Sequence, residues 1–252
     1  MDSFIAWIGG KRLLRRRIIS MFPSSGIDRY VEVFGGAAWV LFGADQHAKA
    51  EIYNDINGDL VNLFRCVKYH YRELQRELRL TLNSREMFFD YRSQMQAEGL
   101  TDIQRAAKFF MIIKLSYGSD RRTYGCTAKN IIKMTGYLEK ASDRLAHVVI
   151  EHRSFEDILR VYDSPGTLFY LDPPYHGTEK YYDNRFAEGD HIRLRDCLSG
   201  ISGKYVLSYN DDAFVRNLYS KNHVIEVTRN SNLTGRYEHA DRKYRELIIT
   251  NY

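Results

Sequence analysis

The residues of this chain that most clearly suggest chemistry are Asp172, Pro173, Pro174 and Tyr175, which directly follow the apolar run 168–171. A β-prone segment that stops at two prolines predicts a buried strand with an abrupt end, because proline cannot donate to a sheet. In open α/β sheets, ligands bind beyond the carboxyl ends of the strands. An acceptor carboxylate, two fixed backbone carbonyls and an aromatic ring would suit a planar base that carries an amino group. A strand followed by a rigid turn explains the same residues without a ligand, so the context has to decide.

A second candidate binding segment is the pair Gly35 and Gly36, which follows a strand-like run over residues 30–34. Glycines at this place allow a tight turn and a close backbone approach, so that a ligand can rest on the amino end of a following helix. Asp55 lies twenty residues after Gly35, and an acid at that distance can accept hydrogen bonds from ribose hydroxyls. A plain strand, turn and helix explains the glycine pair almost as well. With Asp55 in register we favour nucleoside binding.

The amino-terminal stretch 7–11 combines an indole, a tight glycine turn and a lysine at Trp7, Gly10 and Lys11. A cation beside glycine amides would suit the carboxylate of an amino-acid ligand. On its own, this stretch is better explained as an ordinary turn before a helix.

The elements that must position these residues alternate between strand-like and helix-like patterns. We therefore predict a mostly parallel α/β sheet, interrupted by a helical lobe over residues 58–145. Strands are expected at 30–34, 51–53, 147–151, 168–171, 204–208, 223–228 and 244–250, and helices at 11–22, 37–48, 59–82, 85–98, 102–117, 155–162, 191–198 and 212–219.

The composition is that of an ordinary globular protein. The chain has 252 residues, of which 44% are hydrophobic, enough for a packed core. No apolar run approaches the roughly 20 residues that cross a bilayer, so we expect neither a membrane span nor a signal peptide. Cys66, Cys126 and Cys197 are odd in number and far apart. This spacing predicts reduced thiols in a cytoplasmic protein, with no disulfide framework and no metal site.

The positive charge of the chain is concentrated in one segment. The chain contains 37 basic and 32 acidic residues, a net charge of +5. Residues 100–145 contain nine basic and four acidic residues, and therefore carry the same excess. Such a segment is typical of a polyanion-binding surface, although basic faces are often only solvated.

Taken in their order, these segments resemble the Dam-like family of adenine-N6 DNA methyltransferases, in the arrangement that places target recognition before the catalytic motif. The resemblance implies a Rossmann-like methyltransferase sheet, mostly parallel with an antiparallel last strand. Residues 1–57 and 146–252 would then form the catalytic domain, and residues 58–145 the target-recognition domain. The matching stretches are 7–11, 34–36, 55–57, 172–175, 203–211 and 246–252.

The resemblance also implies S-adenosylmethionine as the cofactor. A carboxylate just after a strand, such as Asp157, is more often a helix cap. The implied contacts are Trp7, Gly10 and Lys11 at the methionine end, Glu32, Phe34, Gly35 and Gly36 along the loop, Asp55 at the ribose, Phe155 and Asp157 beside the adenine, and Asp172.

The chemistry of an exocyclic amine explains why the catalytic motif would have this composition. The amine lone pair is conjugated with the purine, and accepting the N–H hydrogen bonds localises it. Asp172 and the Pro173 carbonyl would accept these two bonds and direct the lone pair at the sulfonium methyl group for in-line transfer. Tyr175 would stack on an adenine flipped from the duplex, while Pro174 fixes the backbone.

The expected partner is double-stranded DNA, bound by a monomer or alternatively a dimer. Arg121 and Arg122 could reach guanine edges or phosphates, or could be solvated. The loop 229–243 is a second candidate contact. The basic residues implied in DNA binding are Lys114, Arg121, Arg122, Lys129 and Lys133.

The chain departs from the family pattern at two mild positions, Val33 in place of a frequent proline and Ala38 in place of a frequent glycine. The tyrosine- and asparagine-rich stretch of many GATC-specific members is not visible, so we do not assign GATC. Two alternatives stay open: an RNA or protein amine methyltransferase, and a DNA-binding protein of the same fold without catalysis. A restriction partner also stays open.

Overall fold

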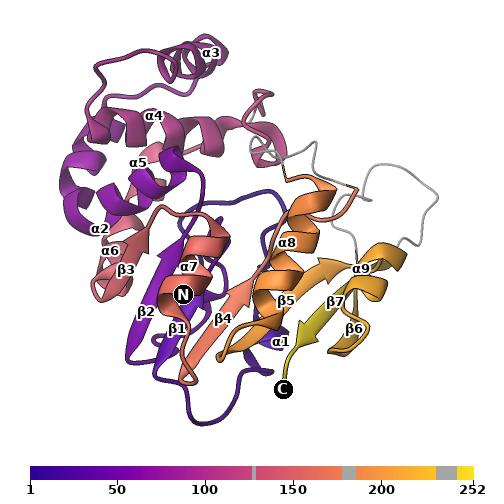
Figure 1. The fold of residues 1–252 in the computed structure, drawn as a ribbon. Coiled ribbons are helices and arrows are strands. Elements are labelled where there is room, and N and C mark those ends of the chain that lie inside the picture. The colour runs from indigo at the N-terminus through magenta and orange to yellow at the C-terminus, as the bar shows by residue number, and fades with distance from the viewer. Residues whose placement is uncertain (127–128, 178–185, 231–242) are drawn as a thin grey trace.

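The structure is a computed structural model that describes residues 1–126, 129–177, 186–230 and 243–252 (Figure 1). Within these ranges, seven strands form one sheet in the order β3-β2-β1-β4-β5-β7-β6. β7 pairs antiparallel with both β5 and β6, and the other described strand pairs are parallel. This confirms the expected mostly parallel sheet with an antiparallel last strand. The strands are β1 (Arg29–Glu32), β2 (Ala50–Asn54), β3 (Val148–Glu151), β4 (Thr167–Leu171), β5 (Lys204–Asn210), β6 (His223–Asn230) and β7 (Lys243–Thr250).

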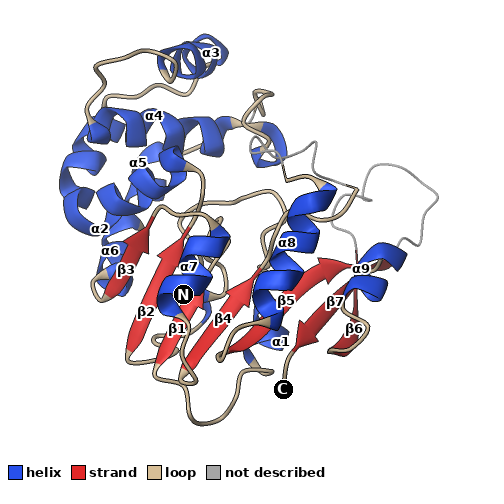
Figure 2. Cartoon of the chain, in the orientation of Figure 1, coloured by secondary structure: helices blue, strands red, loops and turns tan. Residues whose placement is uncertain are grey.

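The sheet is buried on both faces, because successive residues of a strand point to opposite sides. In β4, Phe169 and Leu171 belong to one core and Leu168 and Tyr170 to the other. The first core lies under α7 (Phe155–Tyr162), α8 (Glu188–Ser199) and α9 (Ala213–Leu218), which cover the near face in Figure 2. The second core includes residues of α1 (Arg15–Ile19), a helix shorter than the predicted 11–22.

A group of helices rises above the carboxyl ends of β1, β2 and β3 (Figure 1). The predicted helices 59–82, 85–98 and 102–117 are confirmed, although each ends earlier than expected. The starts of these three helices are fixed locally. Their N-cap side chains each accept a hydrogen bond from a backbone amide of the first turn, and the N-caps are Asn57, Ser84 and Thr101. The elements of this lobe are α2 (Gly58–Arg79), α3 (Arg85–Gln94), α4 (Asp102–Leu115), the 3₁₀ turn η2 (Tyr117–Ser119), α5 (Ile131–Thr135) and α6 (Leu138–Leu145).

The predicted helix over residues 37–48 is wrong, since this segment contains only the 3₁₀ turn η1 (Leu41–Gly43). Ala38 has a φ of 55°, in the left-handed region, which a right-handed helix cannot contain. The glycine loop therefore does not lead into a helix, and a ligand there would meet the loop backbone and not a helix amino end.

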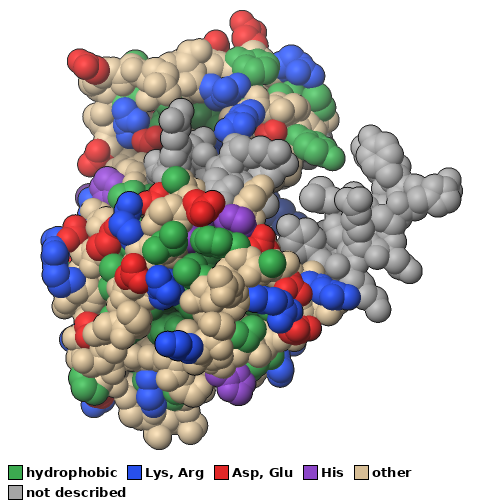
Figure 3. Space-filling model, turned by 45° about the vertical axis from the view of Figure 1, so that its right-hand side comes forward, with side chains coloured by type: hydrophobic (Ala, Val, Ile, Leu, Met, Phe, Trp, Pro, Cys, Tyr) green, Lys and Arg blue, Asp and Glu red, His purple; other side chains and the backbone are tan. Residues whose placement is uncertain are grey.

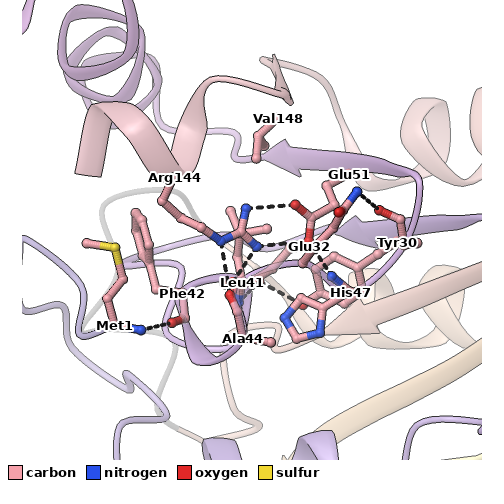
Figure 4. A network of polar contacts seen from close by, with 12 residues as sticks. Met1, Tyr30, Glu32, Leu41, Phe42, Ala44, His47, Glu51, Arg144 and Val148 are labelled. Atoms are coloured by element: carbon pink, nitrogen blue, oxygen red, sulfur yellow. Dashed lines mark hydrogen bonds and ion pairs between the residues drawn. The ribbon is translucent and has the colours of Figure 1, made fainter. Parts of the chain in front are cut away.

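A buried polar network explains why η1 stays short (Figure 4). The guanidinium of Arg144, in α6, donates to the carbonyls of Leu41 and Ala44 at 2.8 and 3.0 Å. In a continuing helix, these carbonyls would instead accept hydrogen bonds from backbone amides one turn later in the chain. Arg144 also donates to both carboxylate oxygens of Glu51 at 2.7 and 2.9 Å. The amide of Leu41 donates to Glu32 at 2.8 Å, so the network connects the helical lobe to the end of β1.

The cysteines Cys66, Cys126 and Cys197 are free thiols. Across the described ranges, no group of three or more His, Cys, Asp or Glu side chains has a metal-binding arrangement. None of the helices described in the structure is long and apolar enough to cross a bilayer.

Candidate active site

A cavity of about 260 Å³ lies beyond the carboxyl ends of β1, β2 and β4, which is the edge where open α/β sheets bind ligands. Its size is close to the lower end of small-molecule sites, about 300 Å³. It brings together segments that are far apart in the sequence. The predicted site residues that line it are Trp7, Gly10, Lys11, Glu32, Phe34, Gly35, Gly36, Asp55, Phe155, Asp172, Pro174 and, from the helical lobe, Arg121.

Asp172 follows β4 and is held by two neighbours. The Lys11 ammonium lies 2.7 and 2.8 Å from its two carboxylate oxygens, and the Ser208 hydroxyl donates to Oδ1 at 2.9 Å. Ser208 lies on the adjacent strand β5 and is buried. Burial raises the pKa of Asp172, and the charge of Lys11 opposes this rise. The pair with Lys11 therefore favours an ionised, oriented acceptor at the edge of the cavity.

Asp55 directly follows β2 and holds the glycine loop in place by a hydrogen bond. Its carboxylate accepts the amides of Gly36 and Asn57, both at 2.8 Å. Gly36 has a φ of 50°, where glycine costs least, and a Cβ atom on Gly35 would collide with the ring of Tyr53. Close packing against Tyr53 therefore explains why residue 35 is a glycine. The Asp55 carboxylate, which accepts one hydrogen bond at each oxygen, has further lone pairs that a ligand could use.

Glu32 lies at the end of β1, between the network of Figure 4 and the cavity. It is buried and accepts hydrogen bonds from the Tyr30 hydroxyl and the Leu41 amide, both at 2.8 Å. Burial raises the pKa of Glu32 to about 8. Burial therefore favours the neutral form of this side chain, whereas a nearby cation would favour the charged form.

Three aromatic rings form an apolar wall of the cavity. The ring centroids of Phe34, Phe155 and Phe186 lie 5.9 to 6.0 Å from one another. Such a wall suits a planar ligand ring. Asp157, which was expected beside that ring, does not line the cavity. It lies in the first turn of α7 and pairs with Arg160.

Tyr175 is buried beside the cavity and is not one of its lining residues. The side chain is only 8% exposed, and its hydroxyl donates to Glu246 at 2.7 Å. The Lys11 ammonium lies 4.7 Å from the ring centroid. The described structure therefore does not present this ring, or the buried Pro173, on the wall of the cavity.

Glu246 contacts two candidate site residues, Tyr175 and Lys11, and was not itself predicted as a site residue. It is buried on β7, opposite Asn210 at the carboxyl end of β5, and lies 3.9 Å from Lys11. Residues that follow parallel strands mark this edge in the sequence, whereas an antiparallel strand reaches the same edge with its early residues. An acid at the start of the apolar run 247–249 was the available signal.

We expect Glu246→Ala to lower the free energy of unfolding by about 1–3 kcal/mol, because it leaves the Tyr175 hydroxyl buried without this acceptor. Glu246→Gln keeps an acceptor oxygen and should cost less. Urea unfolding of both variants, alone and combined with Tyr175→Phe, measures the difference. In the Tyr175→Phe background the cost of Glu246→Ala should shrink, and strictly additive costs would contradict the contact.

Much of the positive charge of residues 100–145 is engaged inside the protein. Arg105 pairs with Asp59 at 2.9 Å, and Arg144 is buried against Glu51. Burial lowers the pKa of Lys114 to about 8 and also lowers that of Lys129, whose ammonium donates to the Lys114 carbonyl. The net charge of the segment therefore overstates its positive surface.

Arg122 and Lys133 are exposed and can meet a polyanion. On the face shown in Figure 3, basic and acidic side chains alternate without one dominant basic patch. Of the second predicted contact, 229–243, residues 231–242 lie outside the described ranges.

Arg121 was expected at the DNA but lies against the cavity. Its guanidinium carbon is 4.4 Å from the centroid of the Trp7 ring. Its charge also lowers the pKa of Asp55, a smaller effect than the burial that raises it.

Comparison with known proteins supplies the context for this geometry. The family model described as D12 class N6 adenine-specific DNA methyltransferase matches residues 7–233. The chain is 28% identical to the type II methyltransferase M1.LlaDCHI of Lactococcus lactis subsp. cremoris, over 100% of this chain and 96% of that protein. It is 27% identical to the type II methyltransferase M.MjaIII of Methanocaldococcus jannaschii, over 100% and 99%, and 25% identical to the DNA adenine methylase of Escherichia coli K12, over 92% and 90%. The similarity therefore covers the helical lobe as well as the sheet.

Proposed function

The chain belongs to the D12 class of N6 adenine-specific DNA methyltransferases, and we propose that it transfers the methyl group of S-adenosylmethionine to an adenine flipped out of double-stranded DNA. The observation that carries this proposal is the joint placement of Asp55 and Asp172 on one cavity, at the carboxyl ends of β2 and β4, the two strands that flank β1. One carboxylate suits a ribose, and the other suits an amine.

The residues of the cavity fit this cofactor. The wall of Phe34, Phe155 and Phe186 suits an adenine ring, and Asp55 has lone pairs for ribose hydroxyls. Glu32 offers a buried carboxyl group to a cationic ligand. When bound, S-adenosylmethionine supplies an electrophilic methyl group on a positively charged sulfur.

Lys11 acts, in this proposal, mainly on the catalytic carboxylate. Its ammonium contacts both oxygens of Asp172, so a ligand carboxylate would have to share it. Together with Ser208 it opposes protonation of Asp172 and orients the carboxylate. Asp172 and the Pro173 carbonyl then accept the two amine N–H bonds, which exposes the nitrogen lone pair for in-line transfer. Pro174 restrains the backbone between these groups.

We further propose that residues 1–57 and 146–252 perform the transfer, and that residues 58–145 select the DNA site. Exposed Arg122 and Lys133 would contact phosphates, in a cytoplasmic enzyme whose free thiols stay reduced. Two relatives are named type II methyltransferases, which favours a modification enzyme of a restriction and modification pair.

Isothermal titration calorimetry with S-adenosylmethionine tests the cofactor assignment. We expect Asp55→Asn to weaken binding about 10- to 100-fold, because the amide cannot accept from both loop amides and a ribose. Asp28→Asn is the matched control, since Asp28 is exposed at the amino end of β1. Unchanged affinity in Asp55→Asn, or no binding by the wild type, would contradict the proposal.

A further inference from the structure

Arg121 belongs to the helical lobe in sequence but to the cofactor cavity in space. Its guanidinium lies against the indole of Trp7, at the part of the cavity wall formed by the amino-terminal stretch 7–11. The indole also lies beside Gly36, whose amide is fixed by Asp55. Arg121 is therefore placed among residues that we assign to the cofactor.

The loop that carries Arg121 is tightly built. The Tyr117 amide donates to the Thr123 carbonyl at 2.7 Å, and the Gly125 amide donates to the Leu115 carbonyl at 2.7 Å. The Asp120 carboxylate accepts the amides of residues 122 and 123, both at 2.9 Å. These bonds close a short turn that contains Arg121, which lines the cavity.

Arg121 itself has an unfavourable backbone conformation. Its φ is 59°, in the left-handed region that arginine rarely adopts. Strained residues of this kind persist where the surrounding structure enforces them, and they concentrate at functional sites. Here the strained residue is the one whose side chain reaches the cavity.

We propose that Arg121 binds the carboxylate of the methionine part of the cofactor, and thereby links the DNA-recognition lobe to occupancy of the cofactor cavity. This inference rests on the proposed function. A guanidinium forms two parallel hydrogen bonds with a carboxylate, a geometry that an ammonium lacks, and the indole restrains its plane. Because Lys11 is engaged by Asp172, Arg121 supplies the second cation at this end of the cavity.

Two ligands separate the carboxylate from the rest of the cofactor. S-adenosylhomocysteine retains the amino-acid part, whereas methylthioadenosine keeps the nucleoside and lacks that part. In calorimetry without DNA, Arg121→Ala should weaken S-adenosylhomocysteine binding about 10- to 100-fold and change methylthioadenosine binding less than about twofold. Arg121→Gly should give the same pattern, and because glycine tolerates the left-handed φ, it guards against a folding defect.

Arg122→Ala is the matched comparison, because its exposed side chain belongs to the same loop. It should leave the affinity for S-adenosylhomocysteine unchanged and weaken DNA binding. Equal losses for both ligands in Arg121→Ala, or no loss for either, would overturn the inference. Failure of the wild-type protein to bind either ligand would instead remove the proposed cofactor itself, and the inference with it.

Discussion

Replacement of Asp172 by asparagine is expected to lower the rate of DNA methylation by about 100- to 10,000-fold. The amide replaces one acceptor oxygen by a donor, which would repel an amine N–H instead of accepting it. The change also removes the charge that pairs with Lys11 at 2.7 Å. Incorporation of tritium from labelled S-adenosylmethionine into DNA, under single-turnover conditions, measures the effect.

Ser208→Ala provides a graded comparison, because it keeps the carboxylate and removes only one hydrogen bond to Oδ1. We expect a loss of about 10-fold, corresponding to a typical net hydrogen bond of about 1.4 kcal/mol. DNA binding by Asp172→Asn should stay near that of the wild type. If Asp172→Asn retained more than a tenth of the wild-type methylation rate, Asp172 would be ruled out as the amine acceptor.

Replacement of Arg144 by methionine is expected to lower the free energy of unfolding by about 3–5 kcal/mol. The change leaves the buried Glu51 carboxylate without its guanidinium, and it removes donors from the carbonyls of Leu41 and Ala44 (Figure 4). Buried ions that lose their partner are costly because the interior cannot replace water. Urea unfolding followed by circular dichroism measures the loss.

Two further variants make this prediction specific. Arg105→Met breaks a half-exposed pair with Asp59, and should cost no more than about 1 kcal/mol. Combining Arg144→Met with Glu51→Gln removes the stranded charge, so the double variant should be more stable than Arg144→Met alone. Equal losses for Arg105→Met and Arg144→Met would show that burial does not set the strength of this network.

Local signals explain why most of the elements could be predicted. The helix 155–162 coincides with α7, because Ser154 provides a side-chain cap and the apolar spacing is helical. The strand before Asp172 coincides with β4, because the two prolines set its end. In both cases neighbouring residues decide the structure.

The failures come from contacts between distant residues. The helix expected at 37–48 is replaced by η1, because Arg144 takes carbonyls that a helix would need. Glu246 was missed because an antiparallel strand brings it to the site, and Arg121 because docking of the lobe turns it toward the cavity. The hydrophobic periodicity of a single segment carries no information about such long-range contacts.

The proposed DNA adenine methylation is tested most directly by expressing the chain in a host without DNA methylation and mapping N6-methyladenine by sequencing. We predict methylated adenines at one short sequence motif with the wild-type protein, and none with Asp172→Asn. Absence of N6-methyladenine with well-folded wild-type protein, or the same methylation pattern with Asp172→Asn, would contradict this proposal.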